Sequence, residues 1–184
     1  LKDVKIKWLW DDRHANDGGP VFIISVDGVH CPINEPRKKP NAKWYSHKFH
    51  KPGLAYEIAI SVYSSKVVWV RGPFPAGTSD LSIFKSTGKG LKHKMPPGTK
   101  AIADRAYTSK SLCATRNDEF DDGRVRKFKR RVRARHENIN ARIKVYNALT
   151  IPFRHGVQKH GAVFDVACIL VQYDMENGHP LFEV

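Results

Sequence analysis

The sequence has few cysteines, and their spacing excludes the scaffolds that depend on them. Its 184 residues include three cysteines, Cys31, Cys113 and Cys168, which lie far apart and form no C-x-x-C pair. An odd number of widely spaced cysteines suits neither a disulfide framework nor a structural zinc site. It is typical of proteins in a reducing intracellular compartment, where thiols stay free.

Long apolar runs are also lacking. The run near the end of the chain, "GAVFDVACILVQY", is too short to cross a membrane and contains Asp165. We find no secretory signal, internal repeat or low-complexity tract. The length predicts a single domain over residues 1–184. Because the chain opens on Leu1, we expect it to be a fragment of a longer protein.

Acidic residues are outnumbered. Lys and Arg number 32 against 18 Asp and Glu, for a formal net charge of +14 and a pI near 9.8. This excess favours a polyanionic partner, with DNA as the first expectation. An anionic membrane surface is the lesser alternative, and a basic surface without a partner is the plain one.

The order of apolar patterns predicts an α/β domain, with a mixed and partly antiparallel sheet and helices packed on it. Continuous apolar runs indicate buried strands, a β-rich pair joined by a serine pair indicates a hairpin, and three-to-four-residue spacing indicates helices. The expected elements are strand 20–27, hairpin 54–64 with 66–74, helix 78–88 capped by Thr78 or Ser79, strand 98–104, helix 124–149 and helix 160–176.

Two of the apolar strands are expected to end on an aspartate, Asp27 and Asp104. Functional sites of open α/β sheets form at the carboxyl ends of strands, so neighbouring strands would bring these carboxylates together. Two close acids repel unless divalent cations hold them ionised, and oxygen ligands suit Mg²⁺ or Mn²⁺. The alternative is that each aspartate only opens a turn, as Asp27 followed by Gly28 would.

A third acid, Glu137, lies on the polar face of the long predicted helix. The apolar stripe of that helix includes Val132, Ile139 and Ile143, and Glu137 points well away from it. The simple alternative is an ion pair with Arg133. Eight of the twelve residues 124–135, in the first half of the same helix, are basic and predict a surface for DNA phosphates: Arg124, Arg126, Lys127, Lys129, Arg130, Arg131, Arg133 and Arg135.

Three segments together carry a resemblance to a known family. "SVDGVHCPI", "GTKAIADRAYTS" and "RARHENINARIKVYNAL" resemble the three acid-bearing motifs of DDE-type transposases, specifically the PIF/Harbinger group with its harbinger-derived nucleases. The resemblance covers nearly the whole chain, and the motifs occur in the right order. One departure is Ala106, where that family often has glycine.

The resemblance implies an RNase H-like fold and a catalytic, metal-binding triad of Asp27, Asp104 and Glu137. Two Mg²⁺ or Mn²⁺ ions would then clamp a scissile DNA phosphate. It also implies a nuclear location and a separate Myb/SANT-like DNA-binding partner, and a homo-oligomer is a further expectation. The alternatives are a domesticated DNA-binding or scaffold protein that does not cut, and a ribonuclease H-like enzyme.

Three residues are auxiliary candidates. Asp80 fits the first turn of a helix better than a role in the site. His30 could equally lie in a turn or contact a phosphate, and Arg105 could contact a phosphate or pair with an acid. Trp44 and Tyr45 lie in a basic loop that could contact DNA. His47 and His50 lack the further ligands of a zinc site, and "HENIN" lacks the second histidine of a zinc protease.

Overall fold

The computed structural model describes residues 21–36, 42–109, 112–114 and 123–184. Within these ranges a six-stranded sheet has the order β2-β3-β1-β5-β6, and β4 pairs with β3. Pairings that involve β3 are antiparallel, and β5 is parallel to β1 and to β6. The predicted mixed α/β sheet with flanking helices, consistent with an RNase H-like fold, is therefore confirmed. The strands are β1 (Val21–Pro32), β2 (Tyr45–Ser46), β3 (Lys51–Ser61), β4 (Val67–Pro75), β5 (Thr99–Ile102) and β6 (Cys113–Ala114).

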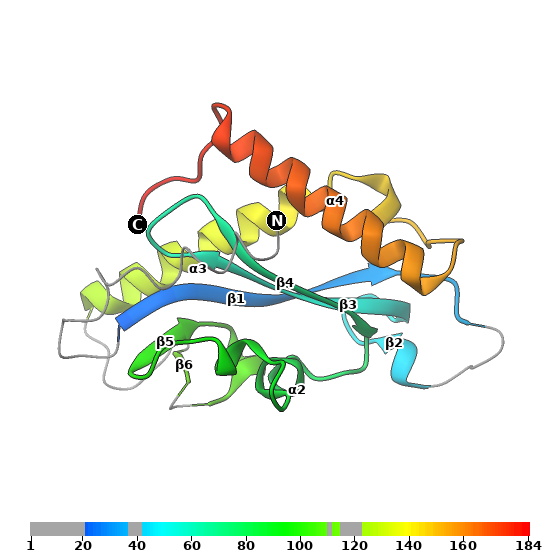
Figure 1. Ribbon diagram of the computed structural model, residues 1–184, viewed down its shortest axis with the longest axis horizontal. Helices are drawn as coiled ribbons and strands as arrows, with labels where there is room; N and C mark the ends of the chain where they lie inside the picture. Colours follow the sequence, from blue (N-terminus) through cyan, green and yellow to red (C-terminus); the bar gives the residue numbers. More distant parts are fainter. Residues whose placement is uncertain (1–20, 37–41, 110–111, 115–122) are drawn as a thin grey trace.

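The helices lie on both faces of this sheet. Two long helices, α3 (Gly123–Ile143) and α4 (Val157–Glu176), cover one face, and the short α2 (Asp80–Lys85) lies on the other (Figure 1). The described ranges also contain short 3-10 turns: η2 (Ala42–Trp44), η3 (Leu91–His93), η4 (Arg105–Tyr107) and η5 (Asn147–Leu149). No helix in the described part of the chain is both long and apolar enough to cross a membrane.

The core has a layer on each face. Ile58, Ile139 and Phe164 belong to the layer under α3 and α4. Val26 and Phe84 belong to the layer on the α2 side. Strand β3 lies between β1 and β4 and is covered on both faces, which explains why its sequence reads as an almost continuous run of apolar and small residues.

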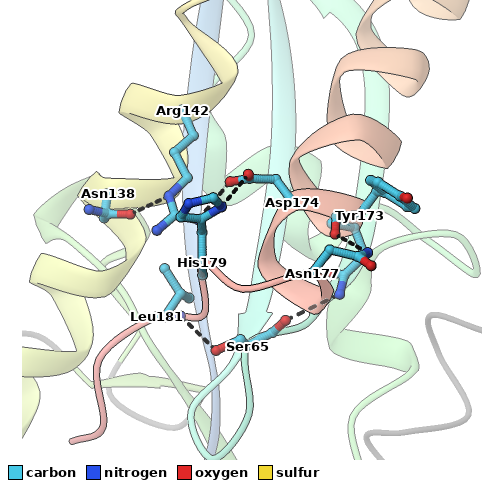
Figure 2. A network of polar contacts seen from close by, with 9 residues as sticks. Ser65, Asn138, Arg142, Tyr173, Asp174, Asn177, His179 and Leu181 are labelled. Carbon is cyan, nitrogen blue, oxygen red and sulfur yellow. Dashed lines mark hydrogen bonds and ion pairs between the residues drawn. The ribbon is translucent and has the colours of Figure 1, made fainter.

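The end of the chain is fastened to the α3–α4 face by a polar network (Figure 2). The Arg142 guanidinium donates to Asp174 Oδ2 at 3.2 Å and to the His179 carbonyl at 2.6 Å. The backbone N–H of Leu181 donates to Ser65 Oγ in the β3–β4 connection at 2.8 Å. The network thus links three segments that are far apart in the sequence: α3, α4 and the connection between β3 and β4.

Several predicted boundaries are wrong. The first strand does not end at Asp27, because β1 continues to Pro32 along its antiparallel partner β3. The long helix ends at Ile143 and not at residue 149, because its last turn tightens: Val145 N donates to Arg142 O and Tyr146 N to Ile143 O. The final helix begins earlier, at Val157, and α2 ends at Lys85. The predicted Ser79 cap of α2 is confirmed, since its Oγ accepts from Ser82 N.

Candidate active site

Asp27 and Asp104 occupy equivalent positions on neighbouring parallel strands. The last parallel pair of β1 and β5 is Ser25 with Ile102, and each aspartate follows two residues later. Side chains two residues apart project from the same face of a strand, and neighbouring strands lie about 4.8 Å apart. Both carboxylates therefore leave the sheet on the same side, where β5 ends.

Asp27 is not in a turn. Gly28 continues β1 and pairs with Glu57 of β3, so the turn explanation for the Asp-Gly pair is wrong. Both carboxylate oxygens of Asp27 are held: Oδ1 accepts from Gly28 N and Oδ2 accepts from Asn140 Nδ2 of α3, each at 2.8 Å. A half-buried acid in mid-strand is costly unless it is bonded in this way.

Asp104 does begin a turn, as the simple alternative for it predicted. It caps η4, and its Oδ1 accepts from Ala106 N at 2.8 Å. The next residue, Arg105, is exposed. The cap fixes the side chain of Asp104 at the end of β5, so this local role and a place in a site are compatible.

Asp80 is a third acid beside these two. It is the first residue of α2, and it lies against Gly28 on the α2 side of the sheet. Burial raises the pKa of the Asp80 carboxyl; the Lys48 ammonium lowers it, and the negative charges of Asp27 and Asp104 raise it. Asp80 follows the N-cap Ser79 and lies in the first turn of α2, as the sequence predicted. In this place the charges of Asp27 and Asp104 act on it, and its role in the site stays a prediction.

Glu137 is exposed on α3. It lies in the turn of helix between His136, whose Nδ1 is 2.8 Å from Ser25 Oγ, and Asn140, which bonds to Asp27. In the described residues no three His, Cys, Asp or Glu side chains lie close enough together to hold a metal ion. The convergence of Asp27, Asp104 and Glu137 on shared ions therefore stays a prediction.

A basic turn between β2 and β3 lies next to the acids. Lys48 Nζ donates to the carbonyl of Gly28 at 2.7 Å, and its positive charge acts on His30 and Asp80. His30 Nδ1 lies 2.8 Å from Ser46 Oγ. Burial, reinforced by the charge of Lys48, lowers the pKa of His30 to about 4, so this ring is neutral at neutral pH. His50 lies 3.2 Å from the Tyr45 hydroxyl, and both residues are exposed.

A buried polar layer lies on the α2 side of β3. Glu57 is 1% exposed, and its Oε1 accepts from Trp69 Nε1 at 2.8 Å. Burial raises the pKa of Glu57 to about 7, although the Trp69 hydrogen bond lowers it. Burial also raises the pKa of the Tyr107 hydroxyl, and the charges of Glu57, Asp80, Asp27 and Asp104 raise it further. The sequence analysis did not single out Glu57, although it is the one acid of an otherwise largely apolar predicted strand.

The basic residues of α3 divide into two groups. Lys129 and Arg135 are buried: the Lys129 ammonium lies 5.2 Å from the Phe22 ring centre, and Arg135 donates to the carbonyls of Val62 and Ser64. Arg131 is exposed, but it donates to the Glu183 carbonyl at 2.6 Å. Buried side chains cannot reach DNA phosphates, so Lys129 and Arg135 are removed from the predicted DNA-binding surface. Its exposed members include Arg126, Lys127 and Arg130.

The chemistry of the acidic site suits a hard divalent cation. Asp27, Asp80 and Asp104 supply only oxygen donors, and the charges of Asp27 and Asp104 act on Asp80. A bound cation lowers the mutual repulsion of such acids, and in the described residues no three of them lie close enough to share one. By the same chemistry a zinc site is not favoured, because zinc in proteins prefers histidine and cysteine ligands.

Comparison with known proteins identifies the family of the chain. Searches found no curated protein and no solved structure that matches the chain. A family model described as DDE superfamily endonuclease matches residues 26–172, a span that begins just before Asp27 and includes Asp104, Glu137 and Asn140. Because the match covers most of the chain, the protein belongs to the DDE superfamily endonuclease family.

Proposed function

We propose that this protein is the catalytic core of a DNA endonuclease or transposase of the PIF/Harbinger type, which cuts or transfers DNA strands with divalent metal ions. The observation that supports it best is the register of β1 and β5. It leaves Asp27 and Asp104 at equivalent positions on the same side of the sheet, where β5 ends. Membership of the DDE superfamily endonuclease family supports a nuclease or transposase activity. Recruitment of a Myb/SANT-like DNA-binding protein, assembly into a homo-oligomer and action in the nucleus are further parts of the proposal.

Asp27, Asp104 and Glu137 would hold two Mg²⁺ or Mn²⁺ ions, with Asp80 as an auxiliary acid. When bound, such ions activate the attacking hydroxyl and offset charge on the leaving oxygen. The protein supplies fixed oxygens: the carboxylate of Asp27 is held by two hydrogen bonds, and that of Asp104 is held by the cap of η4. Fixed ligands favour a defined coordination geometry.

The positive charge of the protein would bring DNA to this edge. Exposed residues of α3 such as Arg126 and Arg130 would bind backbone phosphates, which gives affinity without sequence specificity. Lys48, next to Gly28, would contact a phosphate close to the acids. A chain of net charge +14 attracts DNA over long distances at low salt.

The test is nicking of supercoiled DNA in Mn²⁺ and in Mg²⁺, with Mn²⁺ binding measured in parallel by calorimetry. Any upstream DNA-binding segment or partner protein is included in the assay. Asp27→Asn and Asp104→Asn keep the side-chain shape but remove a charge, so both nicking and Mn²⁺ binding should be lost. DNA binding should persist or tighten, because less negative charge repels the phosphates. Equal nicking by wild type and both variants would place the activity elsewhere, and no nicking by the assembled wild type would favour a scaffold that does not cut.

A further inference from the structure

Asn140 makes a contact with the acidic site that the three-acid description does not include. It is 7% exposed, and its Nδ2 donates to Asp27 Oδ2 at 2.8 Å. Its Oδ1 is buried and has no hydrogen-bond partner among the described residues. An ionised carboxylate only accepts hydrogen bonds, so the reversed amide would set two acceptors against each other. The chemistry of Asp27 therefore fixes the amide orientation, although one oxygen stays unpaired.

Two hydrogen bonds fasten α3 to β1 on either side of Glu137. His136 pairs with Ser25 and Asn140 pairs with Asp27, each at 2.8 Å. Four residues of helix rise about 6.0 Å, and two residues of strand rise about 6.6 Å. The spacings match, so α3 runs along β1 and both bonds form together. Together they set the position of α3 along β1.

We propose that Asn140 is a positioning residue of the acidic site, acting directly on the carboxylate of Asp27. Its amide holds Oδ2 of Asp27 in one orientation while the Gly28 N–H holds Oδ1, so the remaining lone pairs point in fixed directions. Partners behind a metal ligand set the affinity of the site by this means. The proposal rests on the function proposed above.

The competing explanation is that Asn140 only packs α3 on the sheet. The two explanations differ in what they expect from Asn140→Leu. Leucine fills nearly the same space and removes the unpaired oxygen, so packing is kept, but it cannot donate to Asp27. Asn140→Ala removes both the donor and part of the packing. Ser25→Ala is the matched control, because it removes the other α3–β1 bond and leaves the bonds to Asp27 in place.

The experiment is Mn²⁺ calorimetry on the full chain without DNA, with melting temperatures of all four proteins. We expect Asn140→Leu and Asn140→Ala to weaken Mn²⁺ binding about 10- to 100-fold. Both should also lower the melting temperature, because each removes an α3–β1 bond. Ser25→Ala should lower the melting temperature and leave Mn²⁺ affinity within twofold of wild type.

Three results would overturn the role of Asn140. One is unchanged Mn²⁺ affinity in Asn140→Leu while wild type binds the ion, which would leave a packing role only. Another is equal weakening by Ser25→Ala, which would show that any loosening of α3 has this effect. The third is a wild-type protein that binds no Mn²⁺. This result would contradict the proposed function itself, whereas the first two concern Asn140 alone.

Discussion

Asp80 occupies the space that a side chain at position 28 would need. A methyl group on Gly28 would lie 2.4 Å from Asp80 Oδ1, closer than real contacts of this kind. Position 28 thus needs glycine because α2 brings an acid against the backbone of β1. Close approach of another group is a common reason for a glycine within a strand. The contact joins two segments that are distant in the sequence at the edge where Asp27 lies.

Gly28→Ala should therefore displace Asp80. We expect a loss of about 1–3 kcal/mol in the free energy of unfolding, typical of overpacking, and weaker Mn²⁺ binding. Chemical denaturation and calorimetry measure the two effects. Gly123→Ala is the control, because no described atom lies within 4 Å of the added methyl group. A Gly28→Ala protein as stable as wild type, with equal Mn²⁺ affinity, would contradict the importance of the contact.

Glu137→Gln tests the third acid. If Glu137 shares ions with Asp27 and Asp104, the loss of its charge should weaken Mn²⁺ binding at least about tenfold, with little change in melting temperature because the residue is exposed. Glu176→Gln, at an exposed position of α4, is the matched control. Equal Mn²⁺ affinity in wild type and Glu137→Gln would remove Glu137 from the site and leave the acids of the strands and α2.

The exposed basic residues of α3 should govern DNA affinity. Replacement of Arg126, Lys127 and Arg130 by Gln should weaken binding to all sequences and reduce the slope of log affinity against log salt by about 2 to 3. Fluorescence anisotropy over a salt series measures this slope. Gln at Lys85, Lys89 and Lys94 removes the same charge elsewhere and serves as control. Equal slopes for the two variants would show that only net charge matters.

Arg135 should instead govern stability. Arg135→Met leaves the carbonyls of Val62 and Ser64 without their donor, and we expect a loss of about 3 kcal/mol in the free energy of unfolding. Arg130→Met, at an exposed position of the same helix, should change stability by less than about 0.5 kcal/mol. Denaturant unfolding at one pH measures both. Similar losses in the two variants would contradict the structural role of Arg135.

Glu57 should make stability depend on pH. Its pKa is raised to about 7 from an ordinary 4.5, so the folded state holds the proton more tightly than the unfolded chain. Stability is then lost as the pH rises from about 4.5 to about 7, by up to about 3 kcal/mol.

Glu57→Gln removes this dependence. The difference in unfolding free energy between the variant and wild type should grow in favour of the variant from pH 5 to pH 8. His30 and His136, whose pKa values burial lowers to about 4, are present in both proteins, so their effect cancels. A difference that does not change with pH would show that Glu57 is ionised throughout.

The sequence predicted those parts of the molecule that local pattern determines. The apolar runs located the strands and the mixed sheet, and helical spacing located α3 and α4. The position of Asp27 within β1 was missed, because Asp-Gly is a common turn pair and the reason for Gly28 is a contact with α2. Likewise, the burial of Lys129 and Arg135 depends on Phe22 and on the β3–β4 connection, which no pattern in α3 reveals.

In the candidate site, the sequence pointed to Asp27 and Asp104 because acids that follow apolar strands stand out. It gave no sign of Asn140, since an asparagine on the polar face of a helix has no local signature. Its place beside Asp27 depends on how α3 lies along β1. Contacts of this kind are set by packing between elements, and single-sequence patterns describe each element separately.

The pairing of β1 with β5 has a consequence for how the protein folds. The hairpin of β3 and β4 closes a short loop, whereas β1 and β5 are far apart in the chain and pair in parallel over only a few residues. Closing the longer loop costs more entropy, so we expect this pairing, and with it the acidic edge, to form late. Pulse-labelling hydrogen exchange would test the order. The N–H groups of Ala101 and Ala103 point toward β6, so the amide of Ile102 faces β1 and should gain protection after those of β3. A chain that has not finished folding would then already carry the charge that attracts DNA while lacking the arrangement of acids needed to cut it.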